Sequence, residues 1–398
     1  MKILVQKYGG SSLSNTNKIK LISKRVADRV KEGYKLVVVV SAMGNTTDQL
    51  INFSKQISAY PPPRELDMLL ATGEQVTASL LATAINCLGY KARSMTAFQA
   101  GIKTTNDFTD ARISQIDSVK LINLLNDHDV LVITGFQGVN DEGDLTTLGR
   151  GGSDTTAVAL AASLSAPCQI YSDVDGIYSI DPKYYPTAKK RKLVCYDEMI
   201  EMASLGAKVL SSRSVEIAKK FNVPIYCASS NSNERGSYVV SADQIIEEPL
   251  VTGLSVCKNQ TQVTIYNLPL DSEIVFSIFN EVFKQNFNVD MISLIQTELN
   301  LHLSFTLLSS KKDSLNVALT NLCEQYSDSR IEFNEGYSKV SIVGIGMRSS
   351  PGVAQRLFKV LKPYHIKMVT TSEIKISCLV REEDTEKIVK CIAEEFDL

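Results

Sequence analysis

The stretch LVVVVSAMGNTT, residues 36–47, decides the fold class of this chain. An unbroken apolar run that is rich in β-branched valine is typical of a strand covered on both faces. The polar, glycine-containing residues 41–47 follow at once, as expected for a loop at the carboxyl end of such a strand. The run VLVIT at residues 130–134 indicates a second buried strand. The two runs predict a mostly parallel central sheet with helices on both faces.

The rest of the first 230 residues alternates between short β-branched runs and longer helical patterns, as in α/β domains. Further strands are expected at residues 3–6, 92–95, 169–172 and 224–227, and helices at residues 17–32, 65–87, 118–125, 154–164 and 196–205. The polar, turn-rich sequence SSNSNERG follows at residues 229–236. We therefore place a first domain at residues 1–235 and a linker at residues 236–249.

A smaller pattern occurs twice in the remaining chain. Residues 262–335 predict a complete βαββαβ module, with strands at 262–268, 289–296, 301–308 and 330–334 and helices at 272–286 and 311–325. The second copy has strands at 339–345, 366–371 and 374–380 and helices at 352–364 and 384–396, and it lacks a last strand. The run LVTGLSVC, which begins at residue 250, can supply that strand. We expect an interleaved second module made of residues 250–258 and 339–398.

Composition limits the class of protein. The chain has 398 residues, 44% of them hydrophobic, and a net charge of −2, so it has room for two or three domains and gives no electrostatic sign of nucleic acid or of a membrane surface. The opening MKILV and the polar, glycine-rich residues after it predict a strand and turn rather than a signal peptide, and we expect no apolar run to approach the length that spans a bilayer. We expect a cytoplasmic protein. The 8 cysteines include no CxxC pair and there are only 3 histidines, which argues against zinc, iron–sulfur clusters and disulfides.

The segment TLGRGGSDTTA, residues 147–157, resembles an anion cradle at a helix N-terminus. Glycines at 149, 151 and 152 let backbone N–H groups approach an anion closely. Arg150 offers a planar fork for a carboxylate or a phosphate. The expected caps of the following helix are Ser153, Asp154, Thr155 and Thr156. The alternative is a tight turn before a well-capped helix.

Two more loops are candidates for phosphate binding. KYGGSS, residues 7–12, lies between a strand and a helix without matching a Walker A motif, and Lys7 would be a point charge on a transferred group. Ser41 could contact phosphate and Thr47 a substrate carboxylate, because loops at carboxyl ends of strands border the ligand crevice. A simple strand-to-helix turn and hydroxyl caps are the alternatives.

Glu74 follows a glycine inside an apolar helix. Glycine costs a helix about 1 kcal/mol, so a close backbone approach is the expected reason for Gly73. A carboxylate at that point could hold a substrate ammonium. The alternative is a solvated glutamate.

The aspartate-rich segment YSDVDGIYSIDPK, residues 171–183, suits a nucleotide pocket in which a tyrosine stacks on a base and an acid meets ribose or a magnesium-bound phosphate. Lys208 is a second candidate cation for the phosphates. Structural turns would explain the same residues. No histidine stands in a catalytic context, which fits phosphoryl transfer, where positioning and charge neutralisation do most of the work.

Taken together, these motifs resemble those of the aspartokinases. The matching segments are KYGGSS, SAMGNTTD, ATGEQ, GFQGV, TTLGRGGSDTTA, YSDVDGIYSIDP and GAKVL in the first domain, and VGIGMRSSPGVAQRLF and VTTSEIKISCLV in the last module. The resemblance implies an α/β amino acid kinase fold followed by two interleaved, ferredoxin-like βαββαβ ACT modules. It also implies transfer of the γ-phosphoryl group of ATP to the side-chain carboxylate of L-aspartate. The product would be 4-phospho-L-aspartate, the entry to lysine, methionine and threonine synthesis.

The same resemblance implies roles for individual residues. Lys7 and Asp154 would be catalytic. L-aspartate would be bound by Thr47, Glu74, Arg150, Gly151, Gly152 and Ser153. ATP would be bound by Lys7, Tyr8, Gly9, Gly10, Ser41, Ser172, Asp173, Tyr178, Asp181, Lys183 and Lys208. Mg²⁺ would be carried mainly by the ATP phosphates rather than by protein ligands, and the protein would form a homodimer or homotetramer.

The first ACT module departs from the family pattern. It has LPLDSEIVF at residues 268–276, where a Pro-Gly turn is usual, and VDMISLIQT at residues 289–297. Regulation by lysine, by lysine with threonine, or by neither therefore stays open. A related kinase acting on another acceptor, such as acetylglutamate, and a catalytically silent amino acid sensor are the competing functions.

Overall fold

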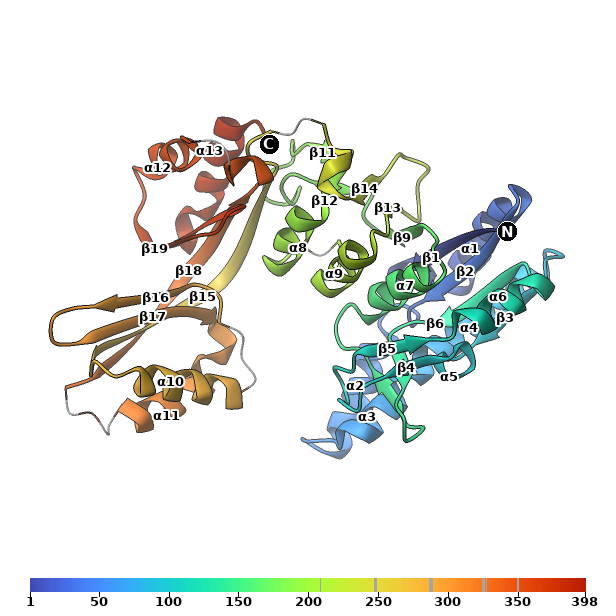
Figure 1. Ribbon diagram of the computed structural model, residues 1–398, viewed down its shortest axis with the longest axis horizontal. Coiled ribbons are helices and arrows are strands. Elements are labelled where there is room, and N and C mark those ends of the chain that lie inside the picture. Colours follow the sequence, from blue (N-terminus) through green and yellow to red (C-terminus); the bar gives the residue numbers. More distant parts are fainter. Residues whose placement is uncertain (208, 247–248, 286–288, 324–325, 327, 349–350) are drawn as a thin grey trace. The chain divides into compact units, whose positions relative to one another are not determined.

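The computed structural model describes the whole chain except residues 208, 247–248, 286–288, 324–325, 327 and 349–350. It divides into two compact units (Figure 1), which we describe separately. The first comprises Met1–Ile177 and Lys190–Glu247, and the second comprises Tyr178–Lys189 and Glu248–Leu398.

The first unit is built on an eight-stranded sheet. Its strands, in spatial order, are β12 (Leu193–Cys195), β14 (Ser237–Val240), β13 (Ile225–Ser229), β9 (Cys168–Ser172), β1 (Lys2–Tyr8), β2 (Tyr34–Val40), β6 (Val130–Thr134) and β3 (Ala92–Met95). The pairs β13–β9, β9–β1, β1–β2, β2–β6 and β6–β3 are parallel, whereas β13 and β14 are antiparallel. The predicted mostly parallel sheet is confirmed.

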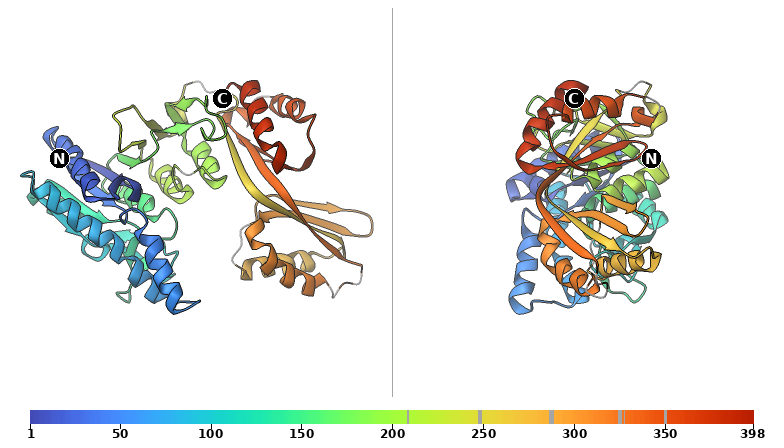
Figure 2. Two further views of the ribbon diagram at one scale, coloured as in Figure 1. Left: turned by 180° about the vertical axis from the view of Figure 1, so that it is seen from behind. Right: turned by 90° about the vertical axis from the view of Figure 1, so that its left-hand side faces the viewer.

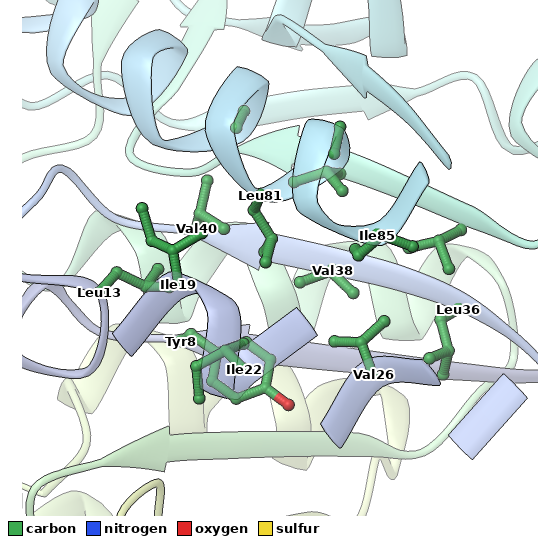
Figure 3. Close-up of a cluster of buried hydrophobic side chains, with 14 of the residues drawn as sticks. Tyr8, Leu13, Ile19, Ile22, Val26, Leu36, Val38, Val40, Leu81 and Ile85 are labelled. Atoms are coloured by element: carbon green, nitrogen blue, oxygen red, sulfur yellow. The ribbon is translucent and has the colours of Figure 1, made fainter. Parts of the chain in front are cut away.

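Helices cover both faces of this sheet. The helices of the unit are α1 (Thr16–Lys31), α2 (Thr46–Ile57), α3 (Pro63–Leu70), α4 (Thr72–Asn86), α5 (Ala97–Ala100), α6 (Ser118–Asp127), α7 (Gly152–Ser163), α8 (Tyr196–Ser204) and α9 (Ser212–Phe221), with short 3₁₀ turns η1 (Gly10–Leu13) and η2 (Ala242–Gln244). Apolar residues of α1 and α4 pack on Tyr8, Val38 and Val40 in one core (Figure 3). Helix α7 contacts β1, β2 and β9 and is itself covered by α9.

A second, four-stranded sheet leads into the glycine-rich segment. Its order is β5 (Ile113–Ile116), β4 (Ile102–Thr104), β7 (Gln137–Val139) and β8 (Leu145–Thr147). A two-stranded pair joins β10 (Ile177–Tyr178) to β11 (Lys190–Arg191). Strand β8 ends at Thr147, so the segment around Arg150 bridges this sheet and α7.

The second unit is one six-stranded sheet carrying two modules. Its order is β16 (Ile292–Gln296), β17 (Leu301–Leu308), β15 (Gly253–Leu268), β18 (Arg330–Val343), β20 (Lys375–Arg381) and β19 (Ile366–Thr371). Helices α10 (Ser272–Lys284) and α11 (Lys312–Cys323) pack on one half and α12 (Val353–Leu361) and α13 (Thr385–Phe396) on the other. The 3₁₀ turns are η3 (Ser309–Lys311), η4 (Ile345–Arg348) and η5 (Glu382–Asp384).

The two modules share their central strands (Figure 2). We expected separate strands at 250–258 and 262–268, and at 330–334 and 339–345, but β15 and β18 each run continuously through both modules. Their antiparallel pairing extends from Gly253 with Val343 to Tyr266 with Arg330, and register shifts between Cys257 and Gln262 absorb the irregularity. Because the ladder of hydrogen bonds continues, the chain has no need of a loop between the modules.

The segment Tyr178–Lys189 belongs to the second unit, although we expected it inside the first domain. Ile180 is buried in the core that α12 and α13 cover, and Tyr184, Tyr185 and Ala188 pack against that core. The carbonyl oxygen of Ser179 accepts a hydrogen bond from Leu254 N at 2.7 Å. Apolar side chains spaced along an aspartate-rich loop explain this attachment.

Two other boundaries differ from the sequence predictions. Residues 237–240, expected in the linker, form β14, whose Ser237, Val239 and Val240 are buried against the sheet. The helix expected at 65–87 is divided at Ala71, whose carbonyl oxygen accepts a hydrogen bond from Gln137 Nε2 at 3.0 Å. Helices α2, α5 and α9 lie outside the helix ranges predicted from the sequence.

The divided helix also bears on the membrane question. Among the described residues one helical stretch, Pro63–Asn86, is long and apolar enough to cross a membrane by length and composition, contrary to our expectation. Half of its apolar 18-residue segment is buried in the protein. Helix α4 contacts α1, β3 and β6, and the stretch carries the buried carboxylates of Asp67 and Glu74. These contacts are those of a core helix.

Candidate active site

A pocket of about 250 Å³ opens in the first unit where β1 and β2 end and α7 begins. Its lining residues are Lys7, Ser41, Thr47, Glu74, Phe136, Gly149, Arg150, Gly151, Gly152, Ser153 and Asp154. The sequence prediction named all of these except Phe136 as site residues or as part of the anion cradle. Segments far apart in the chain therefore meet at one place.

Lys7 and Asp154 form an ion pair in the lining of the pocket. Side chains alternate along a strand, so Tyr8 on β1 enters the core under α1 while Lys7 faces α7. Lys7 Nζ lies 2.7 Å from Asp154 Oδ1, and the two side chains are only 11% and 12% exposed. The ammonium is thus oriented and largely removed from water before any substrate binds.

Glu74 is buried rather than solvated. A Cβ on Gly73 would come within 2.8 Å of Ala42 Cβ, so the glycine lets α4 approach the loop after β2. Glu74 Oε1 accepts a hydrogen bond from Ala42 N at 3.0 Å, while Oε2 is buried without a hydrogen-bond partner in the described part of the chain. Burial raises the pKa of Glu74 to about 7. Such an oxygen is suited to a ligand that donates hydrogen bonds.

The glycine-rich segment has a different cap from the one we expected. Helix α7 begins at Gly152, and Gly151 is its N-cap in the left-handed region at φ +74°. A side chain at 151 would collide with Ser211 Cβ. The hydroxyls of Thr155 and Thr156 bond back to the carbonyls of Gly151 and Gly152, so the predicted side-chain caps are wrong and the amino end of α7 opens onto the pocket.

Arg150 lies between two glycines in the left-handed region, Gly149 at φ +73° and Gly151 at φ +74°. Its side chain lines the pocket and is exposed. Over the residues that the structure describes, no hydrogen bond or ion pair holds its guanidinium. The fork is therefore available to an anionic ligand.

Phe136 is the lining residue that the sequence analysis missed. Its backbone has φ +69°, which is strained for a bulky residue. Phe136 N donates to Thr156 Oγ1 at 3.2 Å and its carbonyl oxygen accepts from Leu148 N at 2.9 Å. The signal was its place in GFQGV between two glycines, of which Gly135 would place a Cβ 2.8 Å from Ser153 Oγ.

The residues predicted to bind ATP are only partly assembled. Lys7 and Ser41 line the pocket, whereas Tyr8, Gly9, Gly10, Ser172 and Asp173, all of them described, do not. The Tyr8 ring is fully buried and stacks on Tyr171 at 5.1 Å, so it cannot stack on a base. Gly10 has a packing role, because a Cβ there would lie 2.7 Å from the carbonyl oxygen of Ala42.

The other residues predicted to bind the nucleotide, where the structure describes them, are not among the residues that line the pocket. Tyr178, Asp181 and Lys183 belong to the segment that packs within the second unit, where Lys183 Nζ pairs with Asp181 Oδ2 at 2.9 Å. Ser172 Oγ accepts from Val174 N at 3.2 Å, and Asp173 is exposed. Lys208 lies outside the described residues.

Comparison with known proteins agrees with the architecture. The model of the amino acid kinase family matches residues 2–229, and an ACT domain model matches residues 340–396. The chain is 44% identical over 402 residues to an aspartokinase of Bacillus sp. (strain MGA3), covering 100% of this chain and 98% of that protein. The chain belongs to the aspartokinase family. Aspartokinase 2 of Bacillus subtilis is 43% identical with the same coverage.

Among solved structures, E. coli aspartokinase III in complex with aspartate and ADP aligns over 100% of both chains with a TM-score of 0.83 and 25% identity. The aspartate kinase of Clostridium acetobutylicum, at 22% identity and a TM-score of 0.81, has the same fold. The resemblance and the fold class predicted from sequence are thus confirmed, and this member of the aspartokinase family is a kinase.

Proposed function

We propose that this pocket transfers the γ-phosphoryl group of ATP to the side-chain carboxylate of L-aspartate. One observation carries the proposal: the same pocket is lined by an ion-paired lysine, by a buried carboxylate with one unpartnered oxygen and by a guanidinium that no described residue binds. Aspartate has two carboxylates and one ammonium, so its charges complement this set. The acceptor carboxylate attacks Pγ, the bond from Pγ to the bridging oxygen breaks, and ADP leaves with 4-phospho-L-aspartate as the product. No proton has to be removed from the acceptor.

The acceptor side is assigned to residues around Arg150 and Glu74. Arg150 grips a carboxylate with its fork, and Glu74 Oε2 accepts from the ammonium. The hydroxyl of Thr47 and the amino end of α7, with Gly151, Gly152 and Ser153, supply further donors to the acceptor.

The phosphate side is assigned to Lys7, Gly9, Gly10 and Ser41. Lys7 neutralises charge that develops on the transferred group, and Asp154 orients the ammonium between turnovers. For the nucleotide itself, Ser172, Asp173, Tyr178, Asp181, Lys183 and Lys208 stay candidates, and Tyr8 contributes at most its backbone.

Magnesium fits the chemistry of the pocket. The described residues contain no group of three or more His, Cys, Asp or Glu side chains placed to hold a metal, and Mg²⁺ prefers phosphate oxygens with few protein ligands. We propose that the ATP phosphates would carry the ion. When bound, Mg²⁺ neutralises charge on the β- and γ-phosphates.

We further propose that the ACT modules bind an amino-acid effector, lysine or threonine or both, and that the enzyme is a cytoplasmic homodimer or homotetramer. The matched ACT domain at residues 340–396 supports an effector role. The first module departs from the family pattern at residues 268–276, which leaves the identity of the effector to experiment.

A coupled assay of ADP release tests the function. L-aspartate should support turnover, whereas N-acetylglutamate and buffer alone should not, and hydroxylamine should trap the acyl phosphate as a hydroxamate. Turnover with N-acetylglutamate alone would indicate the related kinase activity, and none with either would indicate a silent sensor. Adding lysine and threonine, singly and together, identifies the effector.

Arg150→Lys is expected to raise the KM for L-aspartate about tenfold. The lysine ammonium is a point charge and cannot form both of the charge-assisted hydrogen bonds that the guanidinium fork donates to a carboxylate. The KM for ATP should change little. Arg64→Lys is a matched control. Arg64 is an exposed arginine whose guanidinium lies 2.8 Å from Asp144 Oδ1, and it is not among the residues that line the pocket. An unchanged KM for aspartate in Arg150→Lys removes Arg150 from the acceptor site.

A further inference from the structure

The loop that carries Arg150 is attached to a fully buried carboxylate. Asp67 lies on α3, is 0% exposed and is not among the pocket-lining residues. Its Oδ2 accepts hydrogen bonds from Thr147 N at 2.7 Å and from Thr109 N at 2.9 Å, and its Oδ1 accepts from Thr147 Oγ1 at 2.7 Å. Three short hydrogen bonds to one buried carboxylate are strong constraints. Two of them hold Thr147, three residues before Arg150.

A second attachment follows directly along the chain. Arg213 on α9 donates from NH1 to the carbonyl oxygen of Leu148 at 2.9 Å and from NH2 to the carbonyl oxygen of Ala111 at 2.6 Å. Ala111 N in turn donates to the carbonyl oxygen of Thr147 at 2.9 Å. The backbone before Arg150 is thus fixed from α3, from α9 and from the neighbouring strand-like segment.

The backbone at Thr109 shows that this arrangement stores strain. Thr109 has φ +70°, a conformation that is costly for a β-branched residue and persists only where the surroundings hold it. Asp67 accepts the N–H of this residue. The carbonyl oxygen of Thr109 would lie 3.1 Å from a Cβ on Gly149, which has φ +73°. The strained turn at Thr109 therefore packs against Gly149, the residue immediately before Arg150.

We infer that Asp67 is a positioning residue for aspartate recognition, acting through Thr147 on the orientation of Arg150. The inference rests on the proposed function, because it assumes that Arg150 contacts the acceptor. A bidentate fork loses its advantage when its backbone shifts, and small misplacements of binding groups are expensive. Asp67 contacts no substrate in this scheme. Its removal should affect aspartate more than ATP.

Steady-state kinetics on the full chain provide the test. Asp67→Asn keeps the volume but cannot accept all three hydrogen bonds, and we expect the KM for L-aspartate to rise about tenfold, with the KM for ATP changed less than twofold. Thr147→Val removes only the hydroxyl bond and should raise the KM for aspartate about fivefold. Thr147→Ser retains that bond and should behave as wild type. If Asp67→Asn fails to fold, the Thr147 pair carries the same test.

Asp129→Asn is the matched control for a purely structural effect. Asp129 also accepts a backbone N–H, from Lys91 at 3.0 Å, but it precedes β6 at the amino end of the parallel strands, opposite the pocket. The Asp129→Asn substitution should lower the midpoint of thermal unfolding and leave the KM for L-aspartate unchanged. If Asp67→Asn behaves in the same way, the inference is overturned.

A double-mutant cycle identifies the route. If Asp67 acts through Arg150, Asp67→Asn combined with Arg150→Lys should raise the KM for aspartate no further than Arg150→Lys alone. Fully multiplicative effects would overturn the inference and leave the proposed function standing. An Arg150→Lys enzyme with an unchanged KM would contradict the acceptor role of Arg150 in the proposed function, and the inference with it.

Discussion

Lys7→Ala is expected to lower kcat by about 10²-fold or more, which corresponds to roughly 3 kcal/mol of transition-state stabilisation. The ion pair with Asp154 holds the ammonium in a site with little water. A charge oriented in advance stabilises the transition state strongly, because nothing has to reorganise when charge develops on the transferred group. The measurement is ADP release at saturating ATP and L-aspartate.

Lys35→Ala is the control for this experiment. Lys35 Nζ also pairs with an aspartate, Asp129 at 3.1 Å, but it lies near the amino end of β2, away from the pocket lining. It should retain the wild-type kcat. A Lys7→Ala enzyme with nearly unchanged kcat would mean that another cation neutralises the phosphates, and Lys208 is the next candidate.

Glu74→Gln is expected to lower kcat/KM for L-aspartate by about 10²-fold, since neutralising one partner of a buried charge pair costs about 2–5 kcal/mol. Glutamine preserves the size of the side chain and can still accept the hydrogen bond from Ala42 N. It removes the negative charge that would face the substrate ammonium. Glu65→Gln, at an exposed glutamate on α3, is the matched control and should have no such effect.

The pH profile tests the same residue independently. Burial raises the pKa of Glu74 from 4.5 to about 7, so the carboxyl becomes neutral as the pH falls below about 7. Because kcat/KM reports ionisations of the free enzyme, its value for aspartate should fall about tenfold per pH unit on the acid side and level off on the alkaline side. The Glu74→Gln enzyme should lose this step. A wild-type profile that is flat between about pH 6 and pH 8 contradicts the assignment.

Local chemistry made much of this molecule predictable from its sequence. Buried strands such as β2 and β6 are unbroken apolar runs, and a strand covered on both faces has few other compositions. Gly73 was expected to mark a close backbone approach, and its contact with Ala42 is that approach. Carboxyl ends of neighbouring parallel strands converge, which explains why Lys7, at the end of β1, and Ser41, just after β2, were both expected beside the ligand. Arg150 was predicted from the glycines around it and from the helix that follows.

Features that depend on distant partners could not be predicted in this way. Asp67 resembles any helical aspartate until Thr109 and Thr147 are placed around it. Phe136 required knowledge of its backbone conformation. The strand missing from the second module predicted that residues 250–257 pair with it, as Gly253 does with Val343. That β15 and β18 continue unbroken through both modules depends on the whole ladder between them, which no local pattern records.

The attachment of residues Tyr178–Lys189 has a consequence for anyone who wishes to divide this protein. The chain leaves the kinase unit at Ile177, returns at Lys190 and leaves again after residue 247. A catalytic fragment that ends before residue 248 would keep residues Tyr178–Lys189 but lack the core in which Ile180 is buried and against which Tyr184 and Tyr185 pack. These apolar side chains would then be exposed to solvent and would promote aggregation. An isolated catalytic fragment would therefore need residues Tyr178–Lys189 shortened, or their apolar side chains replaced by polar ones. An isolated regulatory fragment would need the same residues added as a separate peptide.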